Sequence, residues 1–313
     1  MEGANQTEVT EFILMGFSAF PELQWILFVM FLIIYLLTIA TNTSIIAIVR
    51  SCPSLHCPMY VLLSNLSFLE IWYTSVTVPK MLAGLLLGNR SISVHGCITQ
   101  MFFFFSMGST EFFLLAVMAY DRYLAICHPL RYSTIMCNIL CLKLSVVAWV
   151  SGFLASSILT VAVSRLSFCG PNEIDHFFCD FVPLAKLSCS DTHLSKLMCF
   201  TLTWAIAGSS FLLTAGSYSC VIWTAWRMPS ESGLQKALTT CGAHIAVTGI
   251  FYGSALSMYA RPPVMESSDM DKVVSFFYCV LTPLLNPIIY TLRNNMVKEA
   301  LRKPMTTLGL FRV

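Results

Sequence analysis

Seven long apolar stretches constrain this chain more than any other feature of its sequence. The hydrocarbon core of a bilayer is about 30 Å thick, and a helix needs about 20 apolar residues to cross it. Each stretch is continuously apolar and lacks the short alternating segments of a membrane β-barrel. The sequence therefore predicts an all-α membrane protein with seven transmembrane helices, at residues 25–49, 59–78, 98–120, 144–163, 197–226, 237–260 and 273–292.

The composition agrees with a membrane protein of one domain. Apolar residues make up 57% of the 313 residues and charged residues only 11%, whereas soluble domains carry about 25% charged residues. We expect one domain over 1–313, with a tail at 1–23, the helix bundle at 24–292 and a C-terminal segment at 293–313. No internal repeat is present, so the sequence does not favour an inverted-repeat transporter.

The distribution of positive charge predicts the orientation. With the N-terminus outside, most of the 18 Lys and Arg residues fall on the cytoplasmic side, in agreement with the positive-inside rule. A basic inner face suits anionic lipids or an acidic partner, and we expect no nucleic-acid partner. The sequon Asn5-Gln6-Thr7 then lies outside, which makes Asn5 the predicted glycosylation site.

The cysteines fit this topology. Four of the 13 fall on the outer side, and an even number in an oxidising compartment indicates two disulfides with three possible pairings. These four are Cys97, Cys169, Cys179 and Cys189.

The segment after the last span is amphipathic. Apolar residues at 292, 296, 300 and 301 share one helical face and basic residues take the other, which predicts an interfacial helix that lies in the membrane plane. The alternative is a solvated basic tail.

Two carboxylates are expected near the middle of the bilayer. Glu111 lies eleven residues before Arg122, about 16 Å along a helix, and Glu70 lies eleven residues after Met59. An ionisable group inside a span costs about 2.5–3.5 kcal/mol on insertion scales, so each is a functional hypothesis. The pair could share a proton or bind a cation such as Na⁺. The alternative is that each is neutral and hydrogen-bonded to the helix backbone or to an amide such as Asn286.

The inner end of the third span carries Asp121-Arg122-Tyr123. Arg stays protonated in proteins, so at the interface it must pair with a carboxylate or reach water and an acidic partner. An arginine that can exchange one of these partners for the other suits a conformational switch. The alternative is an arginine that only extends its charge to the interface.

Prolines weaken the last span. Pro283 and Pro287 each remove a backbone hydrogen bond, which prepares the helix to bend. The alternative is a static kink satisfied by Asn286.

Signatures of enzymes and metal sites are missing. The chain has no HExxH, nucleophile elbow or P-loop. His176 and Cys179 could form half of a metal site, but a disulfide explains Cys179 more simply.

Several motifs together resemble the olfactory receptors, a family of rhodopsin-like G-protein-coupled receptors. They run in order along nearly the whole chain, and the set is highly specific. The matching stretches are LHCPMYVLLSNLSFLEIWY (55–73), MAYDRYLAICHPLRY (118–132), HFFCD (176–180), LSCSDT (187–192), GSY (216–218), LQKALTTCGAHIAV (234–247), FYG (251–253) and PLLNPIIYTLRNNMVKEALRK (283–303).

The resemblance implies a receptor that binds small volatile odorants from outside and activates a stimulatory olfactory-type G protein inside, raising cAMP. It implies a plasma-membrane location in the cilia of olfactory neurons, and it implies no enzymatic activity. It implies a Cys97–Cys179 pair and hence Cys169–Cys189; Cys97 with Cys189 is the alternative. The G-protein switch would comprise Asp121, Arg122, Tyr123, Tyr218, Asn286, Pro287 and Tyr290.

The family's acidic site maps to Glu70, Glu111 and Asn286. Glu70 stands where the family more usually has Asp. Na⁺ is the only cofactor that the resemblance suggests, and the sequence identifies no certain metal site. The odorant pocket would lie between the third, fifth and sixth spans. Its lining, apolar with a few hydroxyls, suits a small neutral molecule, although single positions could serve helix packing instead. The mapped residues are Phe104, Phe105, Gly108, Ser109, Thr203, Ile206, Tyr252, Ala255, Leu256 and Tyr259.

Three rival functions remain at this stage. A non-olfactory chemosensory receptor would share all of these motifs. A transporter or channel would be favoured by repeats or by several charges along a path, and the sequence has neither. An intramembrane enzyme acting through Glu70 and Glu111 would have to turn over a substrate.

Overall fold

The computed structural model describes residues 9–17, 21–227, 231–259 and 268–293 of the chain. Asn5, Ala260 and the residues from 294 onward lie outside the described residues. The predicted glycosylation site and most of the predicted interfacial helix are among them.

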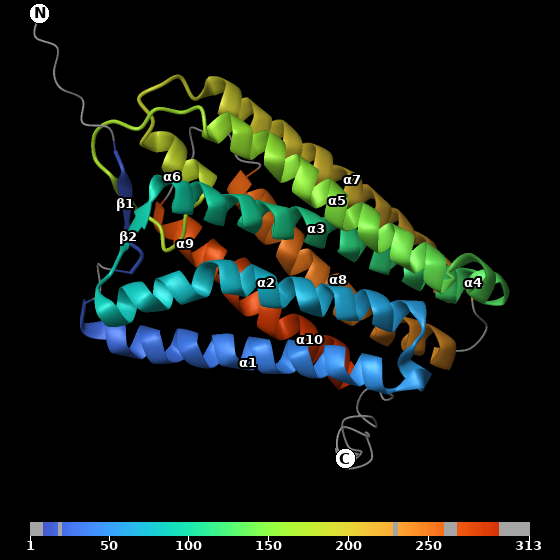
Figure 1. Ribbon diagram of the computed structural model, residues 1–313. Helices are drawn as coiled ribbons and strands as arrows, with labels where there is room; N and C mark the ends of the chain where they lie inside the picture. The colour runs from blue at the N-terminus through green and yellow to red at the C-terminus, as the bar shows by residue number, and fades with distance from the viewer. Residues whose placement is uncertain (1–8, 18–20, 228–230, 260–267, 294–313) are drawn as a thin grey trace, which may run out of the picture.

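Long helices cover the predicted spans, and the all-α seven-helix bundle is confirmed (Figure 1). Six segments of the described residues are long and apolar enough to cross a membrane. The span expected at 237–260 is not among them, and it corresponds to a helix that starts with the polar stretch ESGLQK. The helices are α1 (Gln24–Ser51), α2 (Pro58–Leu87), α3 (Val94–Cys127), α5 (Asn138–Val163), α7 (His193–Trp226), α8 (Glu231–Tyr259), and, for the last span, α9 (Ser268–Phe276), η3 (Phe277–Leu281) and α10 (Thr282–Arg293).

Helix α3 lies at the centre of the bundle, in contact with α2, α5 and α7 (Figure 1). Gly152 lets α5 approach it closely, because a Cβ atom at this position would lie 2.9 Å from the carbonyl oxygen of Ser106. The outward faces of the helices stay apolar: Trp25 is 69% exposed and Leu212 is 72% exposed. Such faces are suited to lipid rather than to water.

The last span contains a widened turn that the sequence analysis did not predict. Residues Phe277–Leu281 form the π-helix η3, which ends two residues before Pro283. A proline has no N–H and its ring collides with the carbonyl four residues earlier, so the helix widens rather than clashing with Cys279. Single π-turns of this kind are frequent at functional sites.

A small three-stranded sheet caps one end of the bundle, which we call the sheet end (Figure 1). Strand β1 (Glu11–Leu14) pairs antiparallel with β2 (Ser91–Ser93) and parallel with β3 (Glu173–Ile174), with Ile13 opposite Ser91 and Glu173. Phe12 is fully buried and packs edge-on against Phe168 at 5.1 Å between ring centroids. Part of the expected tail therefore belongs to the folded structure.

Short helices complete the two ends. The opposite end, which we call the Arg122 end, holds α4 (Pro129–Ile135) and the turn η2 (Pro53–Leu55). The sheet end holds η1 (Pro21–Leu23) and α6 (Phe181–Lys186).

Candidate functional site

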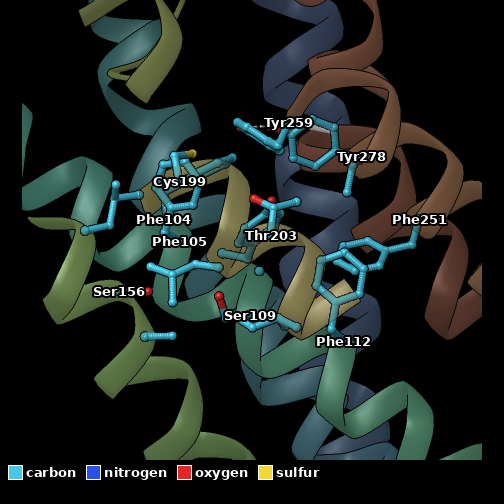
Figure 2. A pocket seen from close by; sticks show the side chains of 17 residues that line it. Phe104, Phe105, Ser109, Phe112, Ser156, Cys199, Thr203, Phe251, Tyr259 and Tyr278 are labelled. Carbon is cyan, nitrogen blue, oxygen red and sulfur yellow. Dashed lines mark hydrogen bonds between the residues drawn. The ribbon is translucent and has the colours of Figure 1, made fainter. Parts of the chain in front are cut away.

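A hollow of about 630 Å³ lies within the bundle, toward the sheet end. Its walls come from α2, α3, α5, α7, α8 and η3, so segments far apart in sequence meet around it. Figure 2 shows its mostly aromatic and aliphatic lining. The lining residues are Tyr73, Phe104, Phe105, Gly108, Ser109, Phe112, Ala155, Ser156, Leu159, Cys199, Leu202, Thr203, Ile206, Phe251, Ala255, Tyr259 and Tyr278.

Most of the predicted pocket residues line this hollow. They are Phe104, Phe105, Gly108, Ser109, Thr203, Ile206, Ala255 and Tyr259. Tyr252 and Leu256 are not among the lining residues. The Tyr252 ring packs edge-on against Phe112 at 4.9 Å and lies beside Phe211, and Leu256 packs against the same core.

Three helical segments were missed by the sequence analysis. Helix α5 contributes Ser156 and two neighbours, α2 contributes Tyr73, and η3 contributes Tyr278. One sequence signal could have revealed α5: Gly152 and Ser156 are small residues four positions apart, and small residues let membrane helices approach each other closely.

The sheet end of the hollow is covered by the segment after β3. Phe178 in this segment is fully buried, and its ring lies 4.5 Å from that of Phe104. A disulfide joins Cys97 to Cys179, and the backbone N–H of Cys179 donates to Gln100 Oε1 at 2.9 Å. The second disulfide joins Cys169 to Cys189, so the pairing is the one that the resemblance implies.

Few polar groups reach the hollow. The Ser109 side chain is partly exposed and its hydroxyl makes no hydrogen bond within the described residues. The Tyr259 hydroxyl donates to Asp180 Oδ1 at 3.0 Å and lies 2.8 Å from the hydroxyl of Tyr278. Figure 2 shows the two tyrosines near each other and Ser109 away from them. The hollow thus offers one open hydroxyl and a tyrosine pair.

Two titratable groups in the covering segment have shifted pKa values. Burial raises the pKa of Asp180 to about 7, although the hydrogen bonds from Phe181 N–H and Tyr259 oppose the shift. Burial, followed by the nearby Lys272 ammonium, lowers the pKa of His176 to about 3. Near neutral pH, His176 is therefore uncharged and Asp180 is close to its titration midpoint.

His176 does not form half of a metal site. Its Nε2 lies 3.2 Å from Ser275 Oγ, and Cys179 is bonded to Cys97. Among the described residues, no group of three His, Cys, Asp or Glu side chains could hold a metal ion.

The two buried carboxylates lie near each other deeper in the bundle. Glu70 of α2 and Glu111 of α3 are both fully buried. Asn286 Nδ2 donates to Glu70 Oε1, and Asn42 Nδ2 donates to the Pro283 carbonyl oxygen at 3.1 Å. Several acceptor oxygens in this group have no hydrogen-bond partner within the described residues: both of Glu111, Oε2 of Glu70, and Oδ1 of Asn42 and Asn286.

Unpartnered buried oxygens are costly unless a proton or a cation satisfies them. Carboxylate and amide oxygens are the ligands that hard cations prefer. The chemistry of these side chains therefore fits either a bound cation or shared protons.

At the Arg122 end, Arg122 is paired internally. Its Nη2 donates to Asp121 Oδ2 at 2.6 Å, and Tyr132 of α4 donates to Asp121 Oδ1 at 2.7 Å. The Asp121 side chain is 1% exposed and that of Arg122 is 16% exposed. The carboxylate is thus held from two sides, and the arginine is turned inward rather than toward water.

The neighbouring residues close the same end. Ala119 of α3, Tyr218 and Val221 of α7 and Cys241 of α8 form a small buried cluster. Tyr218 also hydrogen-bonds His244 of α8. These contacts hold α8 against α3 and α7 beside Arg122.

The other predicted switch residues are spread over two elements. The Tyr123 hydroxyl lies 2.9 Å from His128 Nε2. Asn286 and Pro287 lie in α10, with Pro287 inside the helix. The backbone of Tyr290 belongs to α10, but its side chain lies outside the described residues.

Comparison with known proteins gives a consistent result over almost the whole chain. Residues 31–307 match the profile of the olfactory receptor family. Human olfactory receptor 11L1 is 49% identical over 97% of this chain and 95% of its own length. Human olfactory receptor 11G2 is 50% identical over 96% of this chain and 87% of its own length. Rat olfactory receptor 226 is 46% identical over 97% of this chain and 95% of its own length.

Proposed function

The chain belongs to the olfactory receptor family, and from this premise we propose that the 630 Å³ hollow is its odorant site and that the Arg122 end meets its G protein. The chain is an odorant receptor and a multi-pass membrane protein, not an enzyme. The odorant is small, neutral and mostly apolar. The G protein is of the stimulatory olfactory type and raises cAMP.

The lining of the hollow carries the ligand proposal. None of the lining residues is charged, and most are aromatic or aliphatic. A charged ligand would lose its hydration here without gaining a counter-charge, which is strongly unfavourable. A neutral molecule can instead bury its carbon skeleton against the rings and use the Ser109 hydroxyl for one orienting hydrogen bond.

The orientation follows from the same premise. With the sheet end outside, both disulfides lie in an oxidising compartment and α4 lies in the cytosol. The proposed location is the plasma membrane of the cilia of olfactory neurons, with the N-terminus extracellular. Lipids contact its apolar outer faces.

The contacts at the Arg122 end support the signalling step. In the arrangement described above, Arg122 is bound to Asp121 and α8 is packed against α3. A ligand that favours a form with α8 displaced frees Arg122 to interact with the G protein. The switch comprises Asp121, Arg122, Tyr123, Tyr218, Asn286, Pro287 and Tyr290.

The unpartnered oxygens around Glu70 and Glu111 support a bound Na⁺ as the one small cofactor. Glu70, Glu111, Asn42 and Asn286 would hold it. Such an ion would supply positive charge to a buried group whose unpartnered atoms are all acceptor oxygens.

One experiment tests the odorant proposal directly. Cells that express the receptor together with a stimulatory olfactory Gα subunit are exposed to a panel of neutral and charged odorants, and cAMP is measured. We expect activation by neutral members that is lost in cells without the Gα subunit. Activation by charged members alone would contradict the proposed site chemistry.

A further inference from the structure

A second hollow of about 350 Å³ is lined by the end of α2 and the segment after β1. These two segments lie at the sheet end (Figure 1). None of its lining residues lines the 630 Å³ hollow. The two hollows are therefore separate sites.

Two cations line this second hollow without a counter-charge. Lys80 and Arg90 are both half-buried, and no lining residue is acidic. The ion pairs of the described residues lie elsewhere, at Arg122–Asp121 and Lys272–Asp175. Half-buried positive charges that lack a paired carboxylate favour an anionic ligand.

The chain holds the Lys80 ammonium in place and leaves the Arg90 guanidinium without a partner among the described residues. Gly88 ends α2 in a left-handed conformation with φ of 67°, which turns the chain back over the helix. Lys80 Nζ donates to the Asn89 and Ser91 carbonyl oxygens at 3.3 and 2.5 Å, which leaves one of its three N–H groups for a ligand. The Arg90 guanidinium makes no hydrogen bond or ion pair within the described residues.

The remaining lining is apolar. Met81 is 6% exposed, Leu14 5% and Phe177 2%, so the hollow has a buried apolar floor. The next residues of α2, Leu86 and Leu87, are exposed apolar side chains at the end of the helix. A ligand with a charged head and an aliphatic chain can satisfy both the cations and this surface.

We propose that the hollow between Lys80, Arg90 and the segment Met15-Gly16-Phe17 binds an anionic amphiphile. The ligand has one carboxylate or phosphate head and a short aliphatic chain. Its head pairs with Arg90 and the free N–H of Lys80, and its chain lies against Met81. The source is either a soluble fatty acid or a lipid headgroup.

The test measures binding, so it does not depend on signalling or on the odorant. Purified receptor in nanodiscs of phosphatidylcholine is titrated with radiolabelled octanoate. The variants are Arg90→Gln, Lys80→Gln and Gly84→Leu; the last keeps both cations but fills the hollow, because a Cβ there already meets Arg90 Cγ at 3.7 Å. Arg165→Gln is the matched control, since Arg165 is exposed and outside the hollow.

We expect each of the three variants to bind octanoate at least about tenfold more weakly than the wild type, which is the size of a lost charge-assisted contact. Arg165→Gln should bind like the wild type. The neutral analogue octanol should bind Arg90→Gln, Lys80→Gln and Arg165→Gln as it binds the wild type, whereas Gly84→Leu should weaken octanol too because it fills the hollow. The apparent melting temperature of each purified variant confirms that it is folded.

Replacing part of the phosphatidylcholine by phosphatidylglycerol distinguishes the two sources. Competition with octanoate identifies a lipid headgroup at the same site, and no competition identifies the soluble anion as the ligand. Equal octanoate binding by wild type, Arg90→Gln and Gly84→Leu would overturn the proposal. If Arg90→Gln and Lys80→Gln lost octanol binding as much as octanoate binding, the anionic character of the site would be overturned.

Discussion

The hydroxyl of Tyr259 donates a hydrogen bond to Asp180 Oδ1 at 3.0 Å and thereby joins α8 to the segment that covers the 630 Å³ hollow. The same hydroxyl lies 2.8 Å from that of Tyr278 in η3. Because Tyr259 also lines the hollow, a ligand that shifts its ring acts on all three elements. Contacts of this kind can transmit ligand binding to the last span.

The covering segment predicts opposing effects of pH on stability. The folded-state pKa of Asp180 is raised to about 7. Its contribution to the free energy of unfolding is therefore present at low pH and is lost as pH rises from about 4 through about 7. The folded-state pKa of His176 is lowered to about 3. Its contribution to the free energy of unfolding is therefore present above about pH 6.5 and is lost as pH falls toward about 3. Each effect amounts to at most about 1.4 kcal/mol per pH unit, and between about pH 4 and 6.5 they cancel.

Single substitutions should therefore reveal each effect. Asp180→Asn leaves His176 alone, so the apparent melting temperature of the purified receptor should fall as pH is lowered from 7 to 5. His176→Gln leaves Asp180 alone, and its melting temperature should fall as pH is raised from 5 to 7. The wild type should change less than either variant. Identical pH profiles in all three proteins would show that neither group titrates as described.

Ser109 should set the sensitivity to odorants that carry a hydrogen-bonding group. Ser109→Ala removes the open hydroxyl, and the loss of one neutral hydrogen bond of about 0.5–1.5 kcal/mol raises the half-maximal concentration about 2- to 10-fold. The measurement is the cAMP dose response in cells. Ser106→Ala is the control, because Ser106 Oγ donates to the Phe102 carbonyl oxygen one turn earlier and does not line the hollow. An unchanged Ser109→Ala curve for every agonist would remove Ser109 from the site.

The long helices could be predicted because a membrane leaves few alternatives to continuous apolar helices. The sheet could not be predicted. Strands of two to four residues carry no clear alternation, and β1 pairs with segments far along the chain. The widened turn η3 was equally hidden, although Pro283 marks its cause.

The rotation of α8 about its own axis explains why two of the predicted pocket residues do not line the hollow. Ala255 and Tyr259 line the hollow, whereas Tyr252 and Leu256 lie on the adjoining face. Successive residues of a helix differ by about 100° around the axis. A transmembrane helix is apolar on lipid-facing and buried sides alike, so apolar pattern alone does not fix which side faces the hollow.

Arg122 should be essential for signalling but not for folding. Arg122→Ala should abolish odorant-evoked cAMP while surface expression persists, because the cation that would meet the G protein is removed. Arg131→Ala removes a charge from an exposed position of α4 and should signal normally. A normal cAMP response from Arg122→Ala would exclude the switch role.

Releasing Arg122 from its partner should have the opposite effect. Asp121→Asn removes the negative charge that pairs with Arg122 and weakens the hydrogen bond from Tyr132. Both contacts hold the arginine inward, so we expect higher cAMP without odorant, compared at equal surface expression. Basal cAMP at or below the wild-type level would show that this pair does not restrain the receptor.

The buried acceptors around Glu111 predict stabilisation by Na⁺. A ligand that binds only the folded protein raises its stability by RT ln(1 + [L]/Kd), about 2.7 kcal/mol at 100-fold excess over Kd. The apparent melting temperature of the purified receptor should therefore rise when NaCl replaces choline chloride at equal ionic strength. Glu111→Gln should abolish this rise in melting temperature, because the substitution removes one carboxylate from the cation site while the side chain keeps its size. Asn65→Ala is the control on α2, since Asn65 Nδ2 donates only to the Val61 carbonyl oxygen within the described residues. If Glu111→Gln responds to NaCl as the wild type does, the ion binds elsewhere, and if the wild type does not respond, the carboxylates hold protons instead.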